Sequence, residues 1–110
     1  MKRRALQPEP EPVDPLDQLC HALLQCERVS ELRAFLQDLC TPAELEALSD
    51  RWRVVPMLVQ GVPYREIHER TAVSVTTIGR VARCLGHGAG GYRRVAGRLG
   101  LPLDGPVVPT

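Results

Sequence analysis

One stretch decides the fold: it covers residues 63–85 and reads PYREIHERTAVSVTTIGRVARCL. Its first part, residues 63–70, predicts a short helix, because proline suits the first helical turn. A turn at residues 71–73 follows. Ser74 can then cap a second helix that reaches Leu85, since a serine hydroxyl accepts from an unpaired N–H of the first turn. Two short helices joined by such a turn form a helix-turn-helix.

The second helix of this motif has two unlike faces. At about 100° per residue, one arc collects five apolar residues that we expect to pack on the domain: Val75, Ile78, Val81, Ala82 and Leu85. The opposite arc carries polar and small residues: Thr76, Gly79, Arg80 and Arg83, with Thr77 at its edge. Short polar residues therefore lie near the start of the helix, and arginines follow one and two turns later.

This pattern suits a duplex major groove, which the start of such a second helix enters. Threonine hydroxyls can bond base edges and threonine methyls can touch thymine, while arginines reach guanine or phosphate. Arg65, on the first helix, can clamp the backbone or a guanine. The candidate DNA-contacting residues are Arg65, Ser74, Val75, Thr76, Thr77, Gly79, Arg80 and Arg83. The simpler alternative is an amphipathic helix whose polar face is only solvated.

Two positions depart from the usual pattern of the motif, which favours alanine where His68 stands and glycine where Ala72 stands. We expect His68 to be partly buried and hydrogen-bonded between the helices, with a phosphate contact as the alternative. Ala72 in a left-handed turn conformation would cost about 1 kcal/mol.

The segments before the motif are also helical in pattern. Leucines at three- and four-residue steps predict a helix over residues 15–27. Ser30 is the expected cap of a second helix. Thr41, Pro42 and Glu44 form a strong start signal for a third, in which Thr41 caps, Pro42 takes the first position and Glu44 completes a capping box.

The third helix should end at Gly61. Pro56 lies inside it, and we expect either a kink there or an end to regular helix near Val55. No segment alternates as a strand would, so the predicted fold is all-α.

A glycine-rich loop, GHGAGG, follows Leu85. It should end the second helix of the motif and act as a hinge; as an alternative, its consecutive amides could cradle a phosphate. A last helix over residues 92–99 would turn three arginines toward solvent or the DNA backbone: Arg93, Arg94 and Arg98.

Charge is distributed unevenly along the chain. The 110 residues, enough for one small domain, include 14 basic and 13 acidic ones, for a net charge of +1. Residues 61–100 hold 7 basic and 2 acidic side chains, whereas residues 1–60 hold 7 and 10. The basic half suggests an anionic partner. We expect a disordered Pro/Glu tail over residues 1–13, a helical domain over residues 14–100 and an irregular tail over residues 101–110.

Several protein classes are excluded. No apolar run approaches the roughly 18 residues of a membrane span, and no apolar stretch follows the basic N-terminus as in a secretion signal. The cysteines, which lack a C-x-x-C pair, are expected to be buried, reduced thiols of a cytoplasmic protein: Cys20, Cys26, Cys40 and Cys84. Metal-ligand spacing and nucleophile–base pairs are absent from the sequence, so we expect no enzyme, metal or cofactor.

Long apolar faces on three helices exceed what so short a chain can cover. A homodimer that buries these faces between subunits is the expected solution, and a compact monomeric bundle is the alternative.

Four motifs resemble the Trp-repressor-like family, in particular its YerC/YecD branch. They are LCTPAELEALSDR at residues 39–51, YREI at residues 64–67, TTIGRV at residues 76–81 and GGYR at residues 90–93. The resemblance covers about residues 15–99. It implies an all-helical, intertwined homodimer that binds operator DNA and regulates transcription.

The resemblance also implies a vestigial effector pocket. Thr41, Arg51 and Arg80 stand where the Trp repressor holds tryptophan, with the indole between the two arginines. Val81 replaces a small glycine there, and Cys84 replaces an amine-binding serine. A branched side chain would intrude on the indole, and a thiol is a poor acceptor. Tryptophan is therefore not the expected effector, and the sequence indicates no other.

These observations together predict a sequence-specific transcriptional regulator, a repressor by its resemblance, that reads a palindromic operator in duplex DNA. A protein-interaction module that uses the helical domain as a scaffold is the alternative.

Overall fold

We describe the protein from a computed structural model, which defines residues 13–103. The tails predicted over residues 1–13 and 101–110 therefore fall largely outside the described residues. Within these, the chain forms helices and no strand, which confirms the predicted all-α class: α1 (Pro15–Leu23), α2 (Val29–Leu39), α3 (Pro42–Val59), α4 (Tyr64–Thr71), α5 (Val75–His87) and α6 (Gly91–Arg98). The chain divides into two compact units, Met1–Thr41 and Pro42–Thr110, which are described separately.

The first unit contains α1 and α2. Asp14 caps α1 by accepting a hydrogen bond from the N–H of Leu16 at 2.9 Å, and Pro15 follows in the first turn. The helix ends at Leu23, earlier than the predicted residue 27. The physical reason is a tightening of the backbone after Leu24: the N–H groups of Gln25 and Cys26 donate to carbonyls only three residues back.

The start of α2 corrects a second prediction. Ser30 is not the cap, because the helix begins at Val29 with Arg28 at the cap position and no side-chain cap. The carboxylate of Glu31 accepts from the N–H of Glu27 at 3.0 Å instead, which satisfies a donor just before the helix. The helix thereby begins two residues earlier than a cap at Ser30 would allow.

Neither helix of the first unit buries a residue within the single chain. Leu16 is 64% exposed, Leu24 77% and Val29 85%. The apolar faces that the sequence predicts are thus present, but their residues are only half-buried or exposed.

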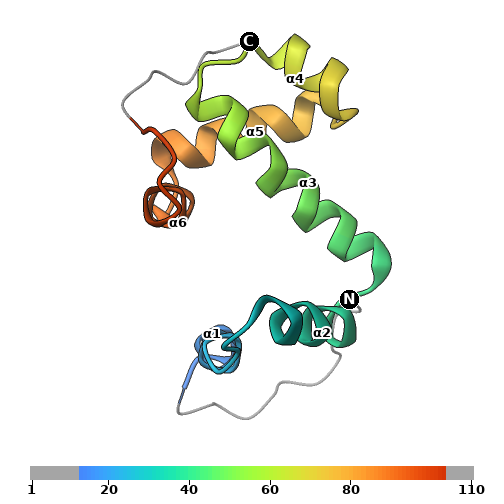
Figure 1. Cartoon of the computed structure of the whole chain (residues 1–110), viewed down its shortest axis with the longest axis vertical. Coiled ribbons are helices and arrows are strands. Elements are labelled where there is room, and N and C mark those ends of the chain that lie inside the picture. Colours follow the sequence, from blue (N-terminus) through green and yellow to red (C-terminus); the bar gives the residue numbers. More distant parts are fainter. Residues whose placement is uncertain (1–12, 104–110) are drawn as a thin grey trace. The chain divides into compact units, whose positions relative to one another are not determined.

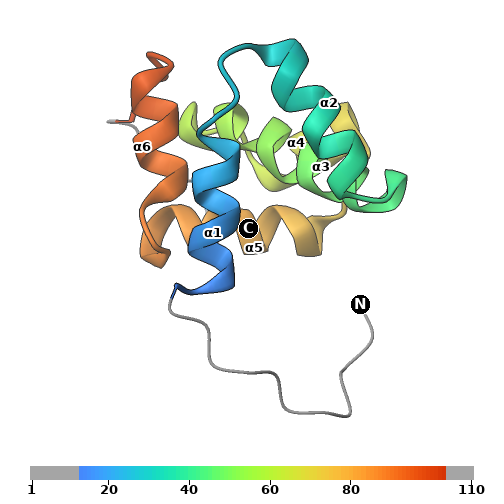
Figure 2. The same ribbon diagram turned by 90° about the horizontal axis from the view of Figure 1, so that it is seen from below.

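The second unit packs α3 to α6 around one core. Figure 1 shows α5 spanning this unit, with α4 at its N-terminal end and α6 at its C-terminal end. The buried apolar residues are Val54, Val55, Leu58, Val59, Tyr64, Ile67, Val73, Ile78, Val81, Ala82, Leu85 and Ala96. Seen from below, α6 rises steeply from the end of α5 (Figure 2). The fold therefore holds α5 from both ends and against α3.

Helix α3 begins directly after Thr41, as its start signal predicts, and continues through Pro56 to Val59. The end expected near Val55 is therefore not seen. Gly61, at φ 81°, stops the helix as predicted. The N–H of Val62 donates to the Met57 carbonyl and that of Gly61 to the Leu58 carbonyl, both at 3.0 Å, which is a Schellman motif.

Helix α6 begins at Gly91 and ends at Arg98, one residue earlier at each end than the predicted 92–99. Gly90, at φ 89°, precedes it. Beyond its end, Leu101 and Leu103 pack against the core of the second unit.

Candidate nucleic-acid interface

The helix-turn-helix is formed by α4, a short turn and α5, close to the predicted boundaries. Pro63 is the cap of α4 rather than its first residue. Ala72 adopts φ 63° and ψ 7°, the left-handed conformation that was expected to be strained for alanine. Its N–H donates to the His68 carbonyl at 2.8 Å, which closes the last turn of α4.

Side-chain hydrogen bonds fix this turn. The hydroxyl of Thr71, buried at 8% exposure, donates to the Ile67 carbonyl at 2.7 Å and accepts from the N–H of Val73 at 3.1 Å. His68 Nδ1 donates to the Val73 carbonyl at 2.7 Å; because a carbonyl only accepts, Nδ1 carries the proton. This confirms the hydrogen bond predicted for His68, but the predicted partial burial is wrong, since the residue as a whole is exposed.

Helix α3 also braces the turn. Arg53 Nη1 donates to the Thr71 carbonyl at 3.4 Å, near the C-terminal end of α4 where carbonyls lack helical partners. No pattern in the sequence signals this contact, since it joins residues that lie far apart in the chain. The orientation of α5 thus depends on α3 as well as on α4.

Ser74 caps α5 as predicted. Its Oγ accepts from the N–H of Thr77 at 3.1 Å and donates to Thr77 Oγ1 at 3.0 Å. Both hydroxyls are therefore used in starting the helix, and the Thr77 hydroxyl keeps its own proton for a partner. Next to them, Thr76 is exposed and makes no such contact.

The buried face of α5 follows the predicted arc with one correction. Ile78, Val81, Ala82 and Leu85 are buried, but Val75 is 43% exposed. Val75 is the first residue of the helix and lies beyond the part of α5 that meets the core. Its methyl groups are therefore available on the outer surface, beside Thr76.

The outer face of α5 is polar and cationic. Arg80 and Arg83 are exposed, and Gly79 is half-buried. A Cβ on Gly79 would lie 3.9 Å from both the Tyr64 ring and Arg83, an ordinary contact, so no steric demand requires glycine here. From residue 71 to residue 103 the sequence has no Asp or Glu, so no carboxylate of this segment offsets these guanidinium groups.

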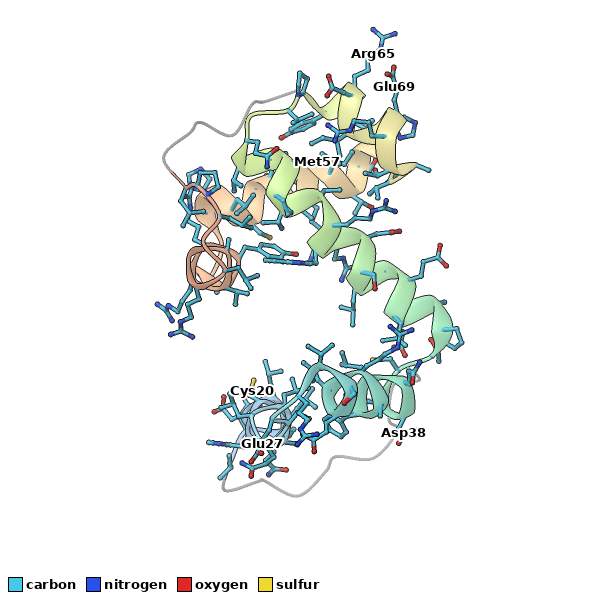
Figure 3. All side chains as sticks on the ribbon, viewed as in Figure 1. Cys20, Glu27, Asp38, Met57, Arg65 and Glu69 are labelled. Atoms are coloured by element: carbon cyan, nitrogen blue, oxygen red, sulfur yellow. The ribbon has the colours of Figure 1, made fainter. Side chains whose placement is uncertain are left out.

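Helix α4 differs, because its arginines are paired within the helix. Arg65 Nε lies 3.7 Å from Glu69 Oε1, and Arg70 Nη1 lies 3.3 Å from Glu66 Oε2. Figure 3 shows Arg65 and Glu69 projecting together from α4. These pairs were not predicted from the sequence, although the four-residue spacing of Arg65 and Glu69 indicates one.

The end of α5 is tied to α6. Arg93 Nε donates to the Leu85 carbonyl at 2.6 Å, so Arg93 is not simply turned to solvent or DNA as predicted. Arg94 and Arg98 are exposed. At Gly88, a Cβ would come within 2.4 Å of the Cys84 carbonyl oxygen, so the chain can leave α5 in this way only with glycine.

The residues of the predicted effector pocket differ in burial. Val81 is 1% exposed and packs in the core, so the structure does not place its side chain in an open site. Arg51 is half-buried, and Arg80 is exposed. Thr41, the last residue of the first unit, is also exposed.

Cys84 lines a pocket that sequence reasoning did not foresee. The pocket has a volume of about 500 Å³, and its walls are Trp52, Cys84, Ala89, Gly90, Gly91, Tyr92 and Val95. The rings of Trp52 and Tyr92 stack there, with centroids 6.4 Å apart and planes inclined by 27°.

Other predicted features can be placed within residues 13–103. All four cysteines are free, but Cys20 is exposed and the others are half-buried, so the expected burial is not seen in a single chain. The described residues contain no cluster of three or more His, Cys, Asp or Glu side chains that could hold a metal. None of their helices is long and apolar enough to cross a membrane.

Comparison with known proteins identifies the family. The family model described as Trp repressor protein matches residues 14–99. The uncharacterized protein YerC of Bacillus subtilis (strain 168) is 38% identical over 84 residues, which cover 76% of this chain and 81% of YerC.

Two crystal structures have the same fold. A TrpR-like protein from Eubacterium eligens ATCC 27750 is 38% identical, with a TM-score of 0.76 over 83% of this chain and 94% of its own. A Trp-repressor candidate from Staphylococcus aureus is 37% identical, with a TM-score of 0.74 over 78% and 86%. The chain therefore belongs to the Trp repressor family of helical, DNA-binding regulators.

Proposed function

We propose that this protein is a sequence-specific transcriptional repressor that binds a palindromic operator as a homodimer. One observation carries the proposal: the outer face of α5 exposes Thr76, Arg80 and Arg83 on a capped helix, in a segment without carboxylates. Such a face attracts phosphate and offers hydrogen-bonding groups to base edges.

The roles of the residues follow from their positions on the motif. Thr76, near the N-terminus of α5, bonds base edges, and the exposed Val75 contacts a thymine methyl. Arg80 and Arg83 reach guanine or phosphate. Ser74 and Thr77 contribute chiefly by fixing the start of α5, since their hydroxyls bond each other.

The homodimer is supported by apolar surface that the single chain leaves open. Besides Leu16 of α1 and Leu24 directly after it, α2 contributes Val29, Leu32 and Leu39, which are 85%, 36% and 48% exposed. Large apolar side chains left exposed on two short helices favour an association site. Two copies would present two α5 helices to successive major grooves, which lie about 34 Å apart on a DNA duplex. The protein would bind this DNA in the cytoplasm.

Tryptophan is not the effector in this proposal. The residue at the amine-binding position is Cys84, a weak acceptor, and its side chain borders an apolar pocket beside Trp52. Calorimetric titration with tryptophan checks this point, and tight binding of tryptophan would contradict it.

The proposal is tested by selecting sequences from a random duplex pool and measuring binding by fluorescence anisotropy at about 50 and 200 mM salt. We expect a palindromic consensus and an affinity that falls steeply with salt. Thr76→Ala and Arg80→Ala should each weaken operator binding while the dimer persists. No duplex binding, or binding indifferent to salt, would overturn the proposal and favour a protein-interaction module.

A further inference from the structure

The charges of the helix-turn-helix are divided between its helices. Helix α5 carries exposed arginines in a segment without any carboxylate, from residue 71 to residue 103. Helix α4 carries Arg65, Glu66, Glu69 and Arg70, which balance one another. If the motif served only to attract DNA, glutamates on α4 would be a disadvantage, because in this motif the first helix crosses the phosphate backbone.

Arg65 is the most available cation of α4. Its side chain is 92% exposed and that of its partner Glu69 66%, and the two point outward together (Figure 3). Arg70, the other arginine, is more covered, with 53% of its side chain exposed. Arg65 is therefore the α4 arginine best able to reach a phosphate, and Glu69 is the group that competes for it.

Glu69 opposes such a contact in two ways. Its carboxylate lies 3.7 Å from Arg65 Nε and favours side-chain conformations that stay along the helix. It also brings a negative charge close to the path of the backbone, and like charges repel. Because the pair is solvent-exposed, it weakens a phosphate contact and does not block it; exposed pairs of this kind alter an equilibrium by at most about five-fold.

We propose that Glu69 is a positioning residue that withholds Arg65 from the DNA backbone, so that α4 adds little sequence-independent affinity and α5 dominates binding. This inference rests on the proposed function, since it concerns how the same motif binds duplex DNA.

The test compares wild type with Glu69→Gln, Arg65→Ala and the double variant, on the selected operator and on a scrambled duplex, over a series of salt concentrations. We expect Glu69→Gln to bind both duplexes about two- to five-fold more tightly. Its salt dependence should steepen by about 0.9 for each additional phosphate that the protein neutralises. In the Arg65→Ala background the same change should have a clearly smaller effect, because only the direct repulsion between Glu69 and phosphate is then removed.

Glu46→Gln is the matched control, because it removes the same charge from an exposed position of α3 outside the motif. It should leave binding unchanged, and circular dichroism should show all variants folded.

Three results would overturn the inference: unchanged affinity in Glu69→Gln, a gain in affinity that is equally large without Arg65, or tighter binding confined to the operator. Failure of the wild type to bind any duplex would instead refute the proposed function, so the two failures can be told apart.

Discussion

Ala72 shows strain at the scale of a single residue. It is the only described residue other than glycine with a positive φ, at 63°. Alanine in this conformation costs at least about 1 kcal/mol. Glycine removes this cost, but part of the gain is offset because glycine has greater conformational freedom in the unfolded chain. We therefore expect Ala72→Gly to raise the free energy of unfolding by about 0.5–1 kcal/mol. Urea denaturation at a fixed protein concentration measures the change.

The control for Ala72 is an alanine with ordinary helical backbone. Ala34 lies inside α2 and is exposed. Glycine there should lower the free energy of unfolding by about 1 kcal/mol. If both glycine variants were destabilised alike, strain at Ala72 would not be a real feature of the turn.

Two neighbouring hydroxyls have separable roles. Ser74 caps α5, whereas Thr76 is exposed two residues later. Ser74→Ala should cost about 1 kcal/mol of stability through the lost cap. Thr76→Ala should leave stability within about 0.5 kcal/mol and weaken operator binding. Paired denaturation and anisotropy measurements check this, and equal stability losses in both variants would contradict it.

At the scale of elements, the end of α5 depends on a contact from α6. The Leu85 carbonyl lies in the last turn of α5, where carbonyls lack helical partners, and Arg93 donates to it. A cationic donor also suits the negative end of the helix dipole. Arg93→Ala should therefore lower the free energy of unfolding by about 1 kcal/mol and speed amide exchange in the last turn of α5.

Arg94→Ala is the matched variant, because it removes the same charge from the next residue, which is exposed. It should alter stability by less than about 0.5 kcal/mol. Equal effects of the two substitutions would mean that charge, and not the hydrogen bond to Leu85, accounts for the result.

The elements also show what could be predicted from the sequence. Boundaries set by one local signal were foreseen, such as the Ser74 cap and the Gly61 stop, because their hydrogen bonds lie within a few residues. The end of α1 was missed because the helix is ended by backbone hydrogen bonds that span three residues, and no side chain signals them. Arg93 was misjudged since its partner is eight residues away across a loop. The exposed face of α5 was foreseen except for Val75, whose position at the helix start removes it from the core.

At the scale of the whole molecule, the uncovered leucines of α1 and α2 give the sharpest remaining prediction. Leu16 is 64% exposed, so a charge there should be harmless in a monomer. If a second copy covers it, Leu16→Glu loses about 1.5–3 kcal/mol of burial and places a carboxylate in an apolar interface. We therefore expect the dimer dissociation constant to rise at least about ten-fold in sedimentation equilibrium.

Gln37→Glu adds the same charge at an exposed polar position of α2 and should leave the dimer intact. In Leu16→Glu, operator affinity should fall because the dimer is lost. A monomer can hold only one half-site and lacks the second set of contacts. A Leu16→Glu protein that remained dimeric and bound the operator normally would show that this face of α1 lies outside the interface. The subunits would then have to associate through other exposed apolar residues, such as Leu48 of α3 and Val95 of α6.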